Sequence, residues 1–302
     1  PPRRFPPSLL LVLSVGCASP HLAEARLPTT DEIGERLGGQ ALTLEGYDGY
    51  TRPVSTSNPR AQFWFDQGFQ MVYGFSHDAG VWAFGRAAQE DPECAMAWWG
   101  IAYGYGVDVN NPLVAEQEAA DAVAAAQNAL RLAESATLAE QALIRAIAKR
   151  AVFPIPEDRT PLDEAYADAM QEAWERFPDD PDVGTLFAES MMNLQAWDYW
   201  TVDGDPVGRA EEIVSVLETV LAAHPDHPGA NHFYIHTVEA SSNPERAVAA
   251  AEKLKNMVPG SGHLVHMPSH IFINVGRYED AVLANQAAIE ADEAYFEVVG
   301  QP

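Results

Sequence analysis

The chain has 302 residues, of which 47% are hydrophobic, and a formal net charge of −26 at pH 7. This apolar content is ample for a folded core and excludes a disordered chain. The acidic balance argues against nucleic acid and anionic membrane surfaces as partners, because both need a basic footprint on the protein.

Residues 1–25 have the pattern of an export segment. A basic start precedes the apolar run Leu9–Val15, which is too short to span a bilayer. The stretch that ends at Cys17 resembles a bacterial lipoprotein box, although Ser14 stands where the pattern usually has Leu. The alternative is ordinary cleavage after Ala25, in a small-x-small sequence. Either way we expect an exported protein: periplasmic, anchored to the outer membrane through a lipid on Cys17, or secreted.

Residues 26–57 show few periodic apolar positions and are predicted to form a linker or irregular arm. Asn58 and Pro59 then indicate a helix start, with Asn as N-cap and Pro at the first helical position. From there to residue 302 the pattern is helical, broken by Pro- and Asp-rich turns, and strand signals are nearly absent. The chain begins with Pro rather than Met and stops after a helix-like segment, so we expect it to be a fragment, truncated at the C-terminus.

The helical region repeats with a period of about 34 residues. Counted from Ala61, the small, aromatic and proline positions of the unit are occupied by Trp64, Gly68, Gly80, Phe84, Ala87 and Pro92. The last unit matches at its later positions, with Gly276, Tyr278, Ala281 and Ala288. Small residues at the recurring positions allow the two helices of a unit to approach closely, while large residues fill the space between units.

On these positions the chain resembles the tetratricopeptide-repeat superfamily. More narrowly, the strings "DPECAMAWWGIA", "HFYIHTVEASSNPERA" and "GHLVHMPSHIFINVGRYEDA" are similar to a group of exported bacterial proteins of this class. The resemblance implies an all-α solenoid of antiparallel helix pairs over residues 58–302, together with export. It implies no reaction, so the sequence does not decide whether the protein is an enzyme.

Seven of the nine histidines lie between His224 and His270. Two compact groups stand out at helical spacing: His232, His236 and Glu239, and then His263, His266 and His270. The repeat register places both groups on the first helices of neighbouring units, facing the concave groove, at a distance that side chains can bridge. The turn histidines His224 and His227 are predicted to be solvated.

Imidazole is the commonest protein ligand for metals, so the two groups predict a divalent-metal site. Zn²⁺ is the first expectation for an imidazole-rich site, with Cu²⁺ or Ni²⁺ as alternatives. Glu239 could act as a ligand or as a general base. Pro268 leaves two alternatives: a helix that begins there, with His263 and His266 in the entering loop, or a kinked helix.

Two rival interpretations need no metal. In the first, the groove binds a peptide or protein partner, and Phe65, Phe69 and Tyr73 fall at groove positions of the first unit, where core burial is the alternative. His77, between the two helices of that unit, could cap the second helix or reach the groove mouth. In the second, protonated imidazoles make a surface that responds to pH below about 6.5.

Overall fold

The described part of the chain, residues 27–300 of this computed structural model, consists of helices and their connections. The predicted export segment, with Cys17, lies outside these residues. Within them there is no β-strand, and only an isolated bridge joins Trp200 and Pro206. None of the described helices is both long and apolar enough to cross a membrane. The prediction of an all-α fold is confirmed.

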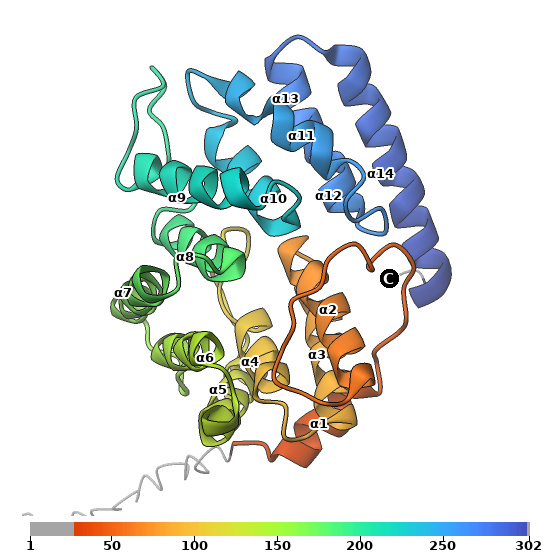
Figure 1. Cartoon of the computed structure of the whole chain (residues 1–302), viewed down its shortest axis with the longest axis vertical. Coiled ribbons are helices and arrows are strands. Elements are labelled where there is room, and N and C mark those ends of the chain that lie inside the picture. The colour runs from red at the N-terminus through yellow and green to blue at the C-terminus, as the bar shows by residue number, and fades with distance from the viewer. Residues whose placement is uncertain (1–26, 301–302) are drawn as a thin grey trace, which may run out of the picture.

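Six helix pairs follow a short first helix (Figure 1). The helices are α1 (Thr30–Gly38), α2 (Pro59–Tyr73), α3 (His77–Glu90), α4 (Ala95–Gly104), α5 (Glu116–Leu132), α6 (Leu138–Arg150), α7 (Thr160–Arg176), α8 (Pro181–Leu194), α9 (Ala210–Ala223), α10 (Pro228–Val238), α11 (Val248–Leu254), α12 (Gly262–His266), α13 (Pro268–Asn274) and α14 (Tyr278–Val299), with short 3-10 turns at Ala133–Ser135 and Pro244–Ala247. The pairs are α2/α3, α4/α5, α6/α7, α8/α9, α10/α11 and α12–α13/α14. First helices of neighbouring pairs also pack together at α2/α4, α4/α6, α8/α10 and α10/α13. This arrangement is an α-solenoid.

The first repeat begins where the sequence predicts. Asn58 is the N-cap of α2, its side chain accepts a hydrogen bond from the backbone N–H of Arg60, and Pro59 occupies the first turn. The arm before it contains a helix that the sequence pattern did not indicate. Thr29 and Glu32 form a capping box at the start of α1, which packs against α3.

The close approach of α2 and α3 depends on two glycines, and this predicts a stability effect. A Cβ on Gly80 would lie 2.6 Å from Val72 Cγ1 and 3.0 Å from the carbonyl oxygen of Gly68. We expect Gly80→Ala to lower the free energy of unfolding by about 1–3 kcal/mol, because the backbone oxygen cannot move aside cheaply. Gly34→Ala in α1 is the control, since its Cβ would meet only Gln89 Cγ at 3.8 Å. Equal urea midpoints for the two variants would contradict this account of the helix contact.

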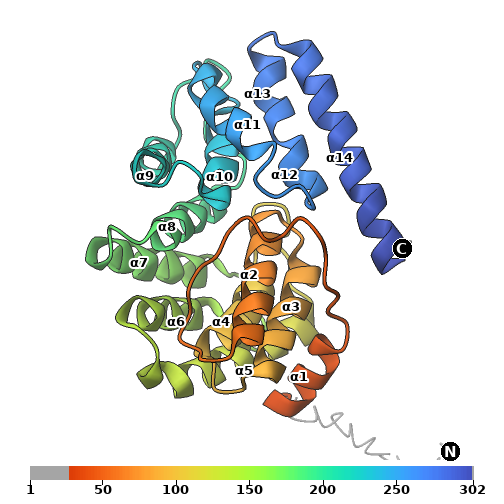
Figure 2. The ribbon, with the colours of Figure 1, turned by 45° about the vertical axis from the view of Figure 1, so that its right-hand side comes forward.

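The solenoid curves until its fifth pair meets its first, so that α10 contacts α2 (Figures 1 and 2). This closure covers the Tyr73 end of the face on which the sequence placed a groove, while Phe84 of α3 packs on Phe65 and Trp99 of α4 packs on Phe69. Phe65, Phe69 and Tyr73 are each 0% exposed, and the Tyr73 ring packs edge-on against Phe233 of α10 at 6.0 Å between centroids. The prediction that these three side chains contact a peptide in an open groove is wrong for this conformation; they are core residues.

A buried carboxylate ties the N-terminal arm to the solenoid. Arg52, 6% exposed, donates from Nη1 to Asp180 at 2.8 Å and to Asp182 at 2.6 Å. Asp182 accepts three more hydrogen bonds, from Tyr50, Tyr73 and His227. The Arg52 charge and these donors hold the pKa of Asp182 well below its usual range, against the effect of burial. The arm is therefore an integral part of the fold.

The prediction that His227 is a solvated turn residue is wrong, because its imidazole is 2% exposed. Its Nδ1 accepts from the N–H of Ala230 at 3.0 Å and caps α10, so its Nε2 carries the proton and donates to Asp182 at 2.9 Å. His224, in the same turn, is exposed as predicted.

A buried carboxyl group on α8 predicts a pH dependence of stability. Glu189 is 4% exposed, its Oε2 has no hydrogen-bond partner among the described residues, and burial raises its pKa from 4.5 to about 7. Because the folded-state pKa lies above that of the unfolded chain, the stability contributed by this group is full below pH 4.5. It is lost as the pH rises through 7.

Between pH 5 and pH 8, we expect the unfolding free energy of the wild-type protein to fall by roughly 1–3 kcal/mol relative to that of a Glu189→Gln variant, which cannot titrate at this position. Urea unfolding of both proteins at the two pH values measures the difference. A stability difference between the proteins that is the same at pH 5 and pH 8 would show that Glu189 does not titrate in this range.

Candidate metal centre

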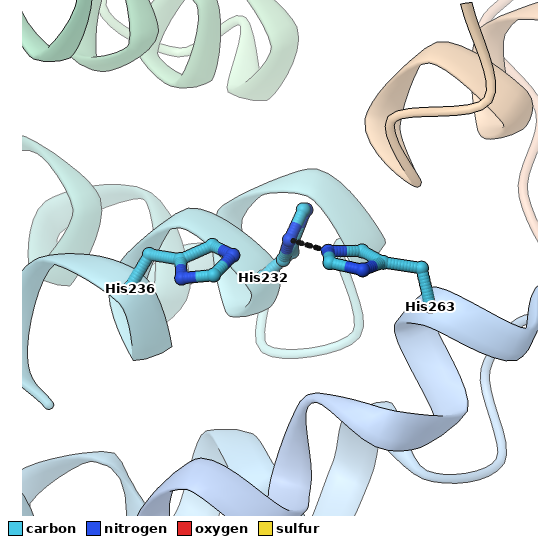
Figure 3. A group of neighbouring side chains, drawn as sticks. All are labelled: His232, His236 and His263. Carbon is cyan, nitrogen blue, oxygen red and sulfur yellow. Dashed lines mark hydrogen bonds between the residues drawn. The ribbon is translucent and has the colours of Figure 1, made fainter. Parts of the chain in front are cut away.

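The two predicted histidine groups meet between α10 and the α12–α13 segment. His232 and His236 lie one turn apart on α10, and His263 approaches them from α12 (Figure 3). One imidazole nitrogen from each of these three residues lies within 4.8 Å of the others. The Nε2 atoms of His232 and His263 are 2.9 Å apart. We call His232, His236 and His263 the triad.

The chain reaches this site through a kinked helix. Met267, between α12 and α13, keeps helical dihedral angles (φ −50°, ψ −38°), and Pro268 opens α13. His263 and His266 are therefore on a helical turn before the kink, not in a loop. The kink lies between His266 and His270. It is expected at Pro268, because proline has no backbone N–H to donate to the carbonyl oxygen of the preceding turn.

Hydrogen bonds donated by Nδ1 fix the orientation of two triad imidazoles. His232 donates from Nδ1 to the carbonyl oxygen of Tyr73 at 2.6 Å, and His236 donates from Nδ1 to Glu239 Oε1 at 3.0 Å. In the neutral rings this leaves Nε2 of both residues as an acceptor, which for His232 lies 2.9 Å from Nε2 of His263. His236 Nε2 is buried and has no hydrogen-bond partner among the described residues. A buried, unpartnered acceptor beside two further imidazoles is the donor set that fits a divalent cation.

Electrostatics keep the triad in the form that binds metals. Burial lowers the pKa of His232 and of His236, and burial together with the neighbouring imidazoles lowers the pKa of His263 to about 3. These rings are therefore neutral near pH 7, and metal ligation requires a neutral imidazole.

Both carboxylate oxygens of Glu239 accept hydrogen bonds from imidazoles. Glu239 is the C-cap residue of α10, and its two carboxylate oxygens accept from Nδ1 of His236 and Nδ1 of His270. Burial acts to raise its pKa, but these two hydrogen bonds prevail and lower it to about 2. In this arrangement the carboxylate orients two imidazoles, and its action as a ligand or a general base stays a prediction.

This role predicts that Glu239→Gln weakens zinc binding about 10- to 100-fold, because an amide can accept on one oxygen only. The reduced affinity should appear in a competition titration against a zinc chelator, with the far-ultraviolet circular dichroism spectrum unchanged. Glu245→Gln, at an exposed position on the turn before α11, is the control. Unchanged affinity in Glu239→Gln would remove the positioning role.

Two aromatic residues, Phe75 and Trp197, complete the site. Phe75 (φ 58°) and Trp197 (φ 65°) are the two non-glycine residues with positive φ in the described range. The Phe75 ring lies 4.6 Å from His232 and 5.2 Å from His263, and the Trp197 ring lies 5.0 Å from His236, between centroids. Strained backbone conformations cluster at functional sites, and both here place an aromatic ring on the triad.

His77 lies beyond Phe75, at a cavity rather than in the triad. It donates from Nδ1 to the carbonyl oxygen of Gly104 at 3.0 Å, and its Nε2 is 3.6 Å from Asp108 Oδ2. Phe75 and His77 both line this cavity of about 540 Å³, and both also line a second one of about 310 Å³. Phe75 therefore separates the triad from the adjoining cavities.

No protein-family model and no curated protein sequence matches this chain. Similar solved structures include "MamA MSR-1 C2" (15% identity, 56% of this chain and 87% of that chain, TM-score 0.38). They also include "Crystal structure of MamA" (10% identity, 76% and 96%, TM-score 0.38) and a MamA mutant (13%, 80% and 99%, TM-score 0.38). At this low identity and TM-score, the similarity gives no information about the histidine site.

Proposed function

We propose that this protein binds a divalent metal ion through the Nε2 atoms of His232, His236 and His263. The proposal rests mainly on one observation: three neutral imidazoles lie with their nitrogens close together at one site between α10 and α12. Hydrogen bonds from Nδ1 orient two of them. Zn²⁺ suits these donors best, and Cu²⁺ or Ni²⁺ would bind comparable ones.

Three protein ligands leave a coordination position open, which is the pattern of catalytic rather than structural zinc sites. A zinc ion held in this way lowers the pKa of a coordinated water and polarises carbonyl or phosphoryl oxygens. The residues around the triad supply the remaining conditions for such chemistry. Glu239 and the Tyr73 carbonyl orient the imidazoles, and the rings of Phe75 and Trp197 limit the access of water.

The proposal includes export, on the basis of residues 1–25. Of the export routes proposed, a lipid anchor on Cys17 can be tested specifically. Labelling cells with a radioactive fatty acid should label the wild-type protein and leave a Cys17→Ala variant unlabelled. A secreted protein cleaved after Ala25 would carry no label in either case.

The metal-free alternatives have narrower support. Partner binding in the concave groove loses its aromatic candidates, since Phe65, Phe69 and Tyr73 are buried. A pH-responsive surface needs imidazoles that become charged just below neutral pH, whereas burial holds the pKa of all three triad residues low.

Metal analysis of the full chain, purified without a histidine tag, tests the proposal. We expect zinc to co-purify and to be removed by a chelator. Added Zn²⁺ at about 100 times the dissociation constant should raise the unfolding free energy by about 2.7 kcal/mol. If no metal co-purifies and neither Zn²⁺ nor Cu²⁺ shifts the melting temperature, the proposal is wrong.

A further inference from the structure

His266 and His270 form a second pair of imidazoles beside the triad. His266 ends α12 and His270 lies on α13, on either side of the kink at Met267. Their Nε2 atoms are 2.9 Å apart. The ring of His270 is 5.7 Å from that of His236, and the ring of His266 is 6.3 Å from that of His263, between centroids.

The Nδ1 atoms of this pair already act as donors. His270 donates from Nδ1 to Glu239. His266 donates from Nδ1 to Asn285 Oδ1 at 2.7 Å, and Ser269 Oγ lies 3.3 Å from the same nitrogen. The amide nitrogen of Asn285 donates to the carbonyl oxygen of Ala281 at 2.8 Å, so its oxygen must face His266.

With both Nδ1 atoms donating, the two Nε2 atoms face each other at hydrogen-bond distance, and in the neutral form of both rings no hydrogen lies between these lone pairs. That contact is repulsive unless a cation lies between the nitrogens. The 2.9 Å contact between Nε2 of His232 and Nε2 of His263 does not have this difficulty, because His263 Nδ1 donates to no acceptor among the described residues. His263 can therefore carry its proton on Nε2 and donate to His232.

We propose that a second divalent cation binds between Nε2 of His266 and Nε2 of His270, so that the metal centre is dinuclear. This inference rests on the proposed function, since the same class of ion occupies the triad. Tetrahedral zinc with bonds of about 2.0–2.1 Å places two ligand nitrogens about 3.3 Å apart, so the pair needs to open by only a few tenths of an ångström. Water or a bound oxyanion would complete the coordination, as in two-metal sites.

The two ions would share one positioning residue. The Glu239 carboxylate accepts from His236 of the triad and from His270 of the pair. A single anion therefore sets the tautomers of ligands in both sites, and loss of this carboxylate should weaken both. Loss of Asn285 should weaken the second ion alone, because its side chain accepts from His266 and forms no hydrogen bond with a triad histidine.

The inference is tested by isothermal titration of Zn²⁺ into the untagged full chain after its metal has been removed, which gives the number of ions bound per chain. We expect two ions per chain in the wild-type protein and one in a His266→Ala, His270→Ala double variant, with the remaining affinity within a few-fold. Asn285→Ala, at an exposed position that tolerates substitution, should bind the second ion about 10- to 100-fold more weakly and keep the first. His224→Ala is the control and should keep two ions.

The outcomes separate the two proposals. One ion in the wild-type protein, unaffected by the double variant and by Asn285→Ala, would overturn the second site and leave the triad standing; a proton shared between the two rings would give this result. No ion in any variant would overturn the proposed function itself.

Discussion

In a His236→Ala variant, zinc affinity at the triad should fall by a factor on the order of 100 or more. Structural zinc sites with four ligands contribute about 10–16 kcal/mol, so one ligand accounts for about 3 kcal/mol. His236 Nε2 is a buried acceptor with no hydrogen-bond partner among the described residues, so it is free to bind the ion. A competition titration against a chelator of known affinity measures the change.

His224→Ala is the matched control for this measurement, because it removes an imidazole at an exposed position at the end of α9. Its affinity for zinc should equal that of the wild-type protein. Equal losses in the two variants would indicate nonspecific binding to surface histidines. An unchanged affinity in His236→Ala, with the fold intact by circular dichroism, would remove His236 from the site.

An Asp182→Asn variant should be about 3–5 kcal/mol less stable than the wild-type protein. The buried carboxylate accepts from Arg52, Tyr50, Tyr73 and His227. Asparagine has the same shape as aspartate, but its amide nitrogen is a donor where the carboxylate has an acceptor. Arg52 is then paired with Asp180 alone. Breaking a buried ion pair costs about 3–5 kcal/mol of unfolding free energy. Because Asp182 holds Tyr73, whose carbonyl orients His232, metal affinity should fall as well.

Urea unfolding compares this variant with Asp179→Asn, a substitution of the same kind at an exposed neighbouring position. The control should unfold at the wild-type midpoint. If Asp182→Asn also unfolds there, the clasp between the arm and the solenoid contributes nothing measurable, and the buried network is not what fixes the arm.

The solenoid could be predicted from the sequence because each repeat is specified by residues close together in the chain, and the same pattern recurs. The spacing of small residues such as Gly68 and Gly80 reports how closely two helices pack, and Asn58-Pro59 marks a helix start. The six candidate ligands were found in the same way, since helical spacing and the repeat register place them on facing stripes of neighbouring helices.

What the sequence did not reveal depends on long-range closure. The curvature that brings α10 onto α2 is a sum of small rotations between pairs. It packs Tyr73 against Phe233 and His227, and both Tyr73 and His227 are buried. The left-handed backbone at Phe75 and Trp197 has no sequence signal, because neither is a residue type that favours positive φ. The role of Glu239 depends on hydrogen bonds from two different helices, which spacing cannot specify.

A crystal structure of zinc-loaded protein, with anomalous differences collected above the zinc edge, tests the central claim most directly. We expect a peak at about 2.0–2.1 Å from Nε2 of His232, His236 and His263 together. Peaks found only at surface carboxylates or at exposed His224, with none within reach of the triad, would contradict the assignment of this site as a metal centre.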